Sequence, residues 1–176
     1  MKRYYLAYGS NLNLEQMSYR CPDAKCIGTA RLLGYELLFK GSKTGSYLTI
    51  EKAKRYNSFV PVGVFEVSKS DEKNLDRYEG YPSFYYKKEL NVSVLRFGSD
   101  EPETLSCFVY IMHEVRPLGL PSPYYMATCQ QGYRDFGFNL RHLRNAYQRT
   151  HRWLMEEETS SVNKLLEQLQ KGRWKP

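Results

Sequence analysis

Apolar and polar residues alternate, or run apolar throughout, in six segments of this chain in the way that is typical of β-strands. In chain order these segments are residues 3–8, 34–40, 47–52, 59–67, 85–96 and 104–112. The last two both alternate, and the polar stretch GSDEPE at 98–103 separates them. We therefore expect these two segments to form an antiparallel pair joined by a loop.

An apolar period of three to four residues, with clear end signals, predicts helices between the strands. A short helix follows Asn13, whose side chain can cap it, and stops at Pro22. Another spans residues 68–80, opening with serine and acidic residues and closing on glycine. A third runs from Ser122 to Gly132, with proline at its first helical position.

The C-terminal part of the chain is polar and also helical in pattern. We expect an arginine-rich helix from residue 139 to about 157, followed by a last amphipathic stripe whose apolar side covers another part of the protein. The stripe consists of Val162, Leu165, Leu166 and Leu169. The final KGRWKP, residues 171–176, is expected to be an exposed basic end.

About six strands that follow one another without regular helical crossovers favour an α+β protein with a largely antiparallel, strongly curved sheet and flanking helices. The pattern alone leaves open whether this sheet closes into a small barrel. With 176 residues, 41% of them hydrophobic, the chain can bury one good core. We therefore expect a single domain with a tail.

The net charge of +7 and the 16 tyrosines would suit a nucleic-acid-binding protein. The charge is divided, however, with +6 over residues 1–55, −3 over 56–133 and +4 over 134–176. A diffuse excess of this kind is typical of a solvated surface, so we expect no nucleic-acid partner. Because the chain has neither a run of eighteen apolar residues nor a signal-peptide pattern, we expect no membrane contact and a cytoplasmic location.

The four cysteines include no CxxC pair, and no histidine stands at zinc-ligand spacing from them. They are Cys21, Cys26, Cys107 and Cys129. We expect free buried thiols, with no metal site and no disulfide.

Two short motifs have the composition of a reactive site. YGSNL, residues 8–12, ends an apolar run just before a helix, where backbone N–H groups can hold a carboxylate or an oxyanion. Glu79 stands in the last turn of a predicted helix, where the macrodipole disfavours its charge, and aromatic residues follow it. Both effects raise a carboxyl pKa toward that of a general base, although a solvated acid at a helix end has the same pattern.

Four segments together resemble the γ-glutamylcyclotransferase family, which includes γ-glutamylamine cyclotransferases and AIG2-like proteins. They are YLAYGSNL (5–12), the run from PVGVFEV to NVSV (61–94), CFVYIM (107–112) and PSPYYMATCQQGYRDFG (121–137). The resemblance covers about residues 4–147 and implies a small barrel-like domain over residues 1–149. Residues 150–176 then form a C-terminal helical extension outside it.

The resemblance also implies roles for single residues. It makes Glu79 the catalytic general acid and base, and Tyr125 part of the substrate site. A tyrosine after the glutamate also lines the site, and Tyr85 matches it best, with Tyr86 as the alternative if the loop differs by one residue. The substrate-holding turn consists of Tyr8, Gly9, Ser10, Asn11 and Leu12.

The reaction implied is cyclisation of a γ-glutamyl amide to 5-oxoproline, with release of an amino acid or amine and with no cofactor or metal. The leaving group stays open, as does the choice between a monomer and a homodimer. A different class of function is a family fold that has lost activity and serves as a binding module, for example for RNA through its basic ends. The presence of Glu79 argues against that alternative.

Overall fold

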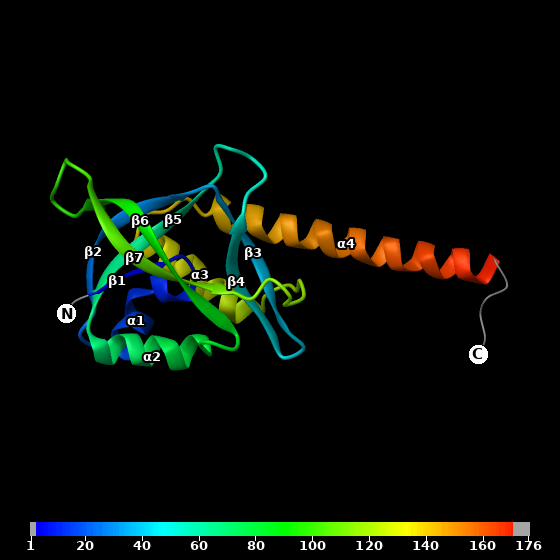
Figure 1. Ribbon diagram of the computed structural model, residues 1–176, viewed down its shortest axis with the longest axis horizontal. Helices are drawn as coiled ribbons and strands as arrows, with labels where there is room; N and C mark the ends of the chain where they lie inside the picture. Colours follow the sequence, from blue (N-terminus) through cyan, green and yellow to red (C-terminus); the bar gives the residue numbers. More distant parts are fainter. Residues whose placement is uncertain (1–2, 171–176) are drawn as a thin grey trace.

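The computed structural model describes residues 3–170, and Figure 1 shows how their strands curve into a closed barrel. The barrel order is β1 (Arg3–Ala7), β5 (Phe59–Val67), β2 (Lys25–Leu33), β6 (Tyr85–Arg96) and β7 (Glu103–Met112). β1 and β7 run parallel and close the barrel, whereas the other neighbouring strands are antiparallel. The expected α+β fold with a strongly curved, mostly antiparallel sheet is confirmed.

The predicted pairing of the last two strands is also confirmed. β6 and β7 are antiparallel, with Tyr85 opposite Met112 and Val94 opposite Glu103. Two further predicted strands, β3 (Tyr35–Ser42) and β4 (Gly45–Lys52), form a separate antiparallel hairpin. This hairpin packs against the barrel, and Thr49 Oγ1 on β4 accepts the N–H of Met112 on β7 at 3.0 Å.

β2 was not among the six predicted strands. A bulge between Cys26 and Gly28 interrupts its alternation, and glycine is itself depleted in strands. The glycine is required by packing, because a Cβ at position 28 would lie 2.2 Å from the carbonyl oxygen of Leu95 on β6. Gly28 therefore allows β2 and β6 to approach closely, and it also interrupts the residue pattern from which β2 could have been predicted.

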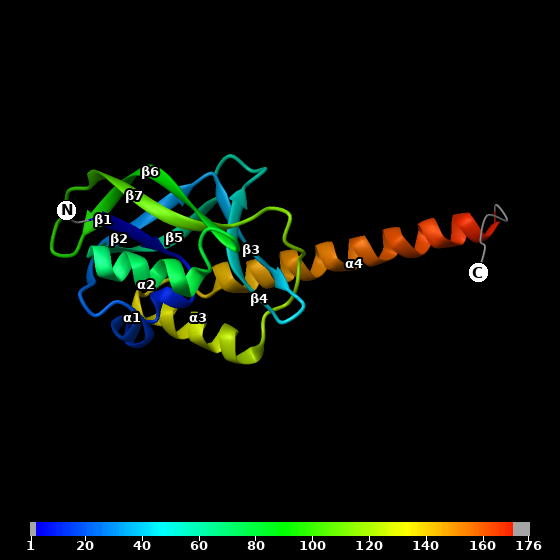
Figure 2. The ribbon, with the colours of Figure 1, turned by 60° about the horizontal axis from the view of Figure 1, so that its bottom comes forward.

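Three helices, α1 (Leu14–Arg20), α2 (Lys69–Glu79) and α3 (Pro123–Asp135), lie together below the barrel in Figure 2. Asn13 caps α1 as expected, since its Oδ1 accepts the N–H of Gln16 at 3.0 Å. α3 begins after Ser122 as predicted but does not end at Gly132. That glycine faces Leu12 and Asn13, just before α1, and a Cβ there would lie 2.5 Å from the N atom of Asn13. It serves a close contact and not a helix end.

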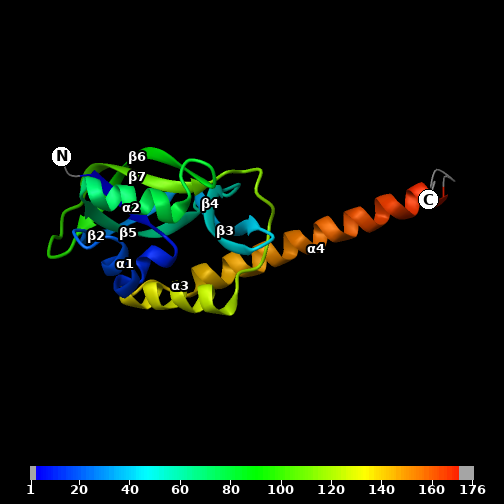
Figure 3. The same cartoon turned by 90° about the horizontal axis from the view of Figure 1, so that it is seen from below.

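α4 (Arg141–Gln170) is one continuous helix where two segments were expected. Its first turns pack on β3, and Thr150 is buried with its Oγ1 accepting the N–H of Phe39 at 3.0 Å. The rest of the helix projects away from the barrel in Figures 1 and 3. The expectation that the distal stripe covers the protein is wrong, because these side chains lie beyond the last contact of the helix with the hairpin. Val162, Leu165, Leu166 and Leu169 are 47–55% exposed.

The four cysteines are free thiols, and Cys21, Cys107 and Cys129 are buried as expected, while Cys26 is half-buried. Among residues 3–170, no three potential ligands from histidine, cysteine, aspartate and glutamate gather in a way that could hold a metal ion. Within the same range, no helix is long and apolar enough to cross a membrane. The predicted basic end, KGRWKP, lies outside the described residues.

Candidate active site

Glu79 is the last residue of α2, and the local sequence determines where that helix begins and ends. Ser68 Oγ accepts the N–H of Asp71 at 3.1 Å, and the Asp71 carboxylate accepts the N–H of Ser68 at 3.1 Å. Gly80 ends the helix with a φ of 63°, a left-handed conformation that favours glycine. The predicted signals thus place Glu79 at a well-defined helix end.

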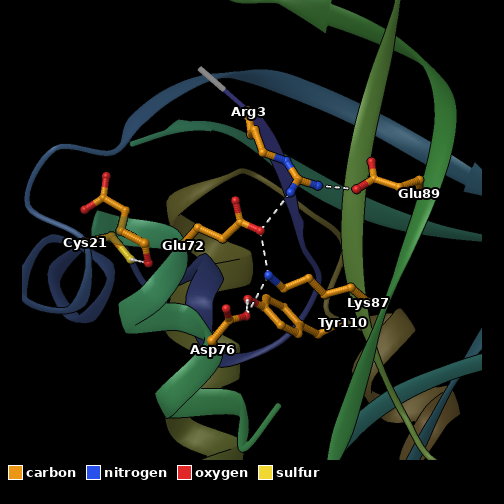
Figure 4. Close-up of polar contacts among 8 residues, drawn as sticks. Arg3, Cys21, Glu72, Asp76, Lys87, Glu89 and Tyr110 are labelled. Atoms are coloured by element: carbon orange, nitrogen blue, oxygen red, sulfur yellow. Dashed lines mark hydrogen bonds and ion pairs between the residues drawn. The ribbon is translucent and has the colours of Figure 1, made fainter. Parts of the chain in front are cut away.

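A chain of ion pairs fixes α2 against the barrel (Figure 4). Lys87 Nζ on β6 lies 2.5 Å from Glu72 Oε1 and 2.8 Å from Asp76 Oδ1. Tyr110 on β7 donates its hydroxyl to the same Asp76 oxygen at 2.6 Å. Because Asp76 lies one turn before the end of α2, these contacts hold the helix end in place relative to the strands.

The chain leaves β1 through Tyr8 and Gly9 into a 3₁₀ turn, η1 (Ser10–Leu12). A Cβ at Gly9 would lie 3.3 Å from the hydroxyl oxygen of Tyr125, so the turn passes close to that side chain. Leu12 donates its N–H to the Gly9 carbonyl at 3.0 Å, and its side chain is fully buried. This is the first hydrogen bond within the turn. The N–H groups of Ser10 and Asn11 come before it in the chain, so they have no acceptor within the turn.

The turn and the helix end meet at the side chain of Asn11. Its Nδ2 donates to Glu79 Oε1 at 2.8 Å and to the Tyr5 hydroxyl at 2.9 Å. Arg20 at the end of α1 donates to Asn11 Oδ1 at 2.6 Å, and its guanidinium lies 3.7 Å from the centroid of the Tyr78 ring. Because the Asn11 oxygen is occupied by Arg20, its amide nitrogen must face the glutamate.

Burial raises the pKa of Glu79 from 4.5 to about 7, and this is the largest influence on the group. The nearby Arg20 charge and the hydrogen bond from Asn11 both lower the pKa but do not cancel the effect of burial. Of the two effects that the sequence pattern suggested, desolvation is therefore the one that raises the pKa of Glu79. A carboxyl group with a pKa near 7 can both accept and return a proton at neutral pH.

The three tyrosines predicted for the site lie around the glutamate, and two of them form hydrogen bonds with one residue of β4. Tyr85 donates its hydroxyl to the Leu48 carbonyl at 2.9 Å, and the Leu48 N–H donates to the Tyr125 hydroxyl at 3.1 Å. Tyr8 donates to the Tyr110 carbonyl at 2.7 Å. Burial raises the pKa of the Tyr8, Tyr85 and Tyr125 hydroxyls, so all three stay protonated at neutral pH.

Tyr86, the alternative to Tyr85, points elsewhere. Its hydroxyl donates to Glu114 Oε1 at 2.7 Å, and its ring lies 5.3 Å from that of His113. As neighbours on one strand, Tyr85 and Tyr86 face opposite sides of β6. Tyr85 is therefore the one of the two that lies next to Glu79.

Glu79 lies where an outer cavity of about 370 Å³ meets a small inner space of about 30 Å³, which is large enough to hold a water molecule. Of the residues predicted for the site, seven line the inner space: Tyr8, Gly9, Ser10, Asn11, Glu79, Tyr85 and Tyr125. Leu12 is absent from both linings and belongs to the core. Four of the seven also line the outer cavity: Ser10, Glu79, Tyr85 and Tyr125.

Comparison with known proteins places this arrangement in a family. A family model described as "Gamma-glutamyl cyclotransferase, AIG2-like" matches residues 5–127, which include the YGSN turn and Glu79. The γ-glutamylcyclotransferase of Homo sapiens is 31% identical over 147 residues, which is 78% of this chain and 73% of the human protein. The Bos taurus protein of the same name is 32% identical over 146 residues, with the same coverage. The chain belongs to the γ-glutamyl cyclotransferase, AIG2-like family.

The fold agrees with this family membership. A solved structure named "Gamma-glutamyl cyclotransferase" superposes with a TM-score of 0.70 at 27% identity, covering 83% of this chain and 86% of that one. The family model ends at residue 127, so α4 and most of α3 lie beyond the matched range.

Several residues of the cavity in this family member were not predicted. The inner space is also lined by Tyr5, Leu48 and Tyr110, and the outer cavity by Ser42, Thr44, Tyr47, Arg77, Tyr78, Gly80 and Phe84. Arg77, Tyr78, Gly80 and Phe84 lie within five residues of Glu79 in the sequence, and this closeness could have identified them. The β3–β4 hairpin residues carry no comparable signal, because only the tertiary fold brings that hairpin to the end of α2.

Proposed function

We propose that this protein cyclises γ-glutamyl amides to 5-oxoproline, with Glu79 as the general base and acid and without a metal or cofactor. The observation that carries the proposal is the hydrogen bond from Asn11 to Glu79, which joins the YGSN turn to a carboxylate at the floor of a cavity. Membership of the γ-glutamyl cyclotransferase family supports the same reaction.

In such a substrate the α-amino nitrogen attacks the γ-carbonyl carbon and closes a five-membered lactam. The amine must lose a proton to attack, and at neutral pH it is mostly an ammonium group. Glu79 in its ionised form accepts that proton, and in the same site it returns a proton to the departing nitrogen as the old C–N bond breaks. No water molecule is consumed, and no covalent bond to the protein is formed.

The turn supplies the electrostatic part of the mechanism. Ser10 and Asn11 line the same inner space as Glu79, and their N–H groups, which the turn itself leaves unbonded, can bind the substrate's α-carboxylate or the oxyanion that develops on the γ-carbonyl. Removing one oxyanion donor costs about 2.7–4 kcal/mol of transition-state stabilisation in other enzymes. The rings of Tyr8, Tyr85 and Tyr125 line the inner space and limit the entry of water, and the hydroxyl oxygens of Tyr8 and Tyr85 can still accept hydrogen bonds from the substrate.

The size of the outer cavity, about 370 Å³, is at the small end of the range for small-molecule sites and fits a γ-glutamyl compound of dipeptide size. The direct test is incubation of the pure protein with a panel of γ-glutamyl dipeptides and γ-glutamyl amines. We expect 5-oxoproline and the free amine to appear in equal amounts. Free glutamate in place of 5-oxoproline would mean hydrolysis by water and would contradict the proposed ring closure.

A further inference from the structure

The distal part of α4, residues 156–170, presents an apolar stripe to solvent. This part of the helix projects from the barrel in Figures 1 and 3, and every one of its residues is exposed. Four apolar side chains recur at intervals of three and four residues, so they lie on one side of the helix. We call this set the distal stripe: Val162, Leu165, Leu166 and Leu169. An apolar stripe that the rest of the fold does not cover marks an interaction surface.

The residues around the distal stripe indicate what kind of partner fits it. At 3.6 residues per turn, the two charged residues of the same turns, Lys164 and Glu167, lie on the opposite side of the helix. A helix that binds a membrane surface carries lysine or arginine beside its apolar face, whereas the centre of a protein interface is depleted of charge. The arrangement therefore favours a protein partner. The side chains that border the stripe are all polar and uncharged: Thr159, Ser161, Asn163, Gln168 and Gln170.

The sequence of this segment gives its helix little stability of its own. Residues 159–163, TSSVN, all belong to types of low helix propensity. Thr159 and Ser161 also donate their hydroxyls to the carbonyls of Met155 and Glu157, at 2.8 and 2.9 Å, and such bonds weaken a helix slightly. Most helices in proteins are stabilised by packing of their apolar face. Because the barrel does not reach the distal stripe, a second molecule has to provide that packing.

The distal stripe is symmetric about a point between residues 165 and 166. Val162 and Leu169 lie at equal distances on either side of this point, and so do Leu165 and Leu166. Two antiparallel copies of the helix, related by a two-fold axis at this point, place every apolar residue of one copy opposite an apolar residue of the other. Self-complementarity of this kind is the defining property of an isologous dimer interface. The stripe therefore fits a second copy of the same chain.

We propose that two copies of this chain associate through their distal stripes, as an antiparallel pair of α4 helices. Glu158 lies one turn before Val162 on the same side of the helix, so in a parallel pair the two Glu158 carboxylates would meet at the contact and repel each other. In the antiparallel pair they are roughly 22 Å apart along the helices, at 1.5 Å per residue. The two barrels then stand at opposite ends of the pair.

The mass of the natural protein, measured by light scattering over a range of concentrations, tests this association. The contact spans only about two turns of helix, so we expect a dissociation constant in the micromolar range. The mass should rise from 20.7 kDa, that of one chain, to twice this value. Leu165→Gln/Leu166→Gln replaces two of the four apolar side chains by a good helix former and should keep the mass of one chain at every concentration.

Lys164→Gln/Glu167→Gln is the matched control, because it introduces the same residue type on the opposite side of the same turns. This variant should still form dimers. In dilute solution, where the natural protein is also a single chain, both variants should keep its melting temperature. A spin label on Glu156→Cys measures the orientation, with the labelled natural protein as the background for its own cysteines. The two labels should lie roughly 28 Å apart along the antiparallel pair, whereas a parallel pair holds them side by side.

Four results would overturn the proposed association. The first is a natural protein that keeps the mass of one chain up to millimolar concentration. The second is a dimer that persists in Leu165→Gln/Leu166→Gln or that the control loses equally, since its contact would then lie elsewhere. The third is a mass that grows beyond two chains, as expected if the stripe binds a different surface of the next copy. The fourth is a short distance between the labels, which would refute the antiparallel arrangement.

Discussion

Replacing Glu79 by glutamine tests the proposed chemistry most directly, because it changes charge and leaves size almost unchanged. The glutamine oxygen can still accept the amide hydrogen of Asn11, which lies 2.8 Å from Glu79 Oε1 in the natural protein. The substrate ammonium, however, loses its proton acceptor. General acid–base catalysis contributes about 10²–10⁴-fold in enzymes, so kcat should fall at least about 100-fold while substrate binding survives.

The same substitution has a calculable effect on stability. Burial raises the pKa of Glu79 from 4.5 to about 7, so the Glu79 carboxyl ionises less readily in the folded protein than in the unfolded chain. The free energy of unfolding contributed by this group is therefore largest below pH 4.5, falls as the pH rises and is lowest above pH 7. A change of this size in pKa corresponds to at most about 3 kcal/mol.

In the variant, the glutamine at position 79 carries no charge at any pH. Its free energy of unfolding therefore lacks this decline with rising pH. We expect its melting temperature to exceed that of the natural protein by several degrees at pH 8 and to match it at pH 4, where Glu79 is protonated. Glu158→Gln, which removes an exposed acid on α4, should change neither rate nor melting temperature.

Two assays on the same samples decide the matter: release of 5-oxoproline, and thermal unfolding at pH 4 and pH 8. A Glu79→Gln protein that keeps a third or more of its activity would refute the catalytic role. A variant that is inactive and also less stable at pH 8 would point to a structural role for the carboxylate instead.

Further predictions concern the surroundings of the site and the C-terminal helix. Arg20 lowers the pKa of Glu79, so Arg20→Gln should move the rising limb of the kcat/KM profile from about pH 7 to higher pH, and an unmoved limb would contradict the electrostatic link. We propose that residues 150–176 are an extension of a domain spanning 1–149. Because Thr150 still contacts Phe39, a chain ending after Met155 should keep its melting temperature and turnover, and unfolding of that chain would refute the proposed boundary. Since the ring closure needs only a base and oriented donors, prolonged treatment with a chelator should leave turnover unchanged, and loss that added zinc or magnesium reverses would contradict the metal-free proposal.

The helix ends were predictable because their signals are local. Asn13, Ser68 and Gly80 each act within four residues of their own position, so the sequence alone predicts where α1 and α2 begin or end. The fold class followed from the same kind of evidence, since alternation within single strands needs no knowledge of their partners.

The contacts that complete the site are not local and could not be predicted from patterns. Arg20 and Asn11 are nine residues apart, and Leu48 meets Tyr85 and Tyr125 across 37 and 77 residues. Leu48 contributes through its backbone groups, which every residue except proline carries in full. Nothing in the identity of such a residue reveals that it supports two tyrosines of the cavity.

The projecting part of α4 has a consequence for the size of the protein in solution. Residues 156–170 are all exposed, and the twenty residues after Thr150 extend roughly 30 Å at 1.5 Å per residue. A rod of that length on a small barrel increases hydrodynamic drag well beyond that of a sphere of equal mass. A single chain should therefore elute early in gel filtration, in the position of a larger globular protein. Light scattering, which reports mass independently of shape, is the measurement that distinguishes this elongated monomer from a homodimer.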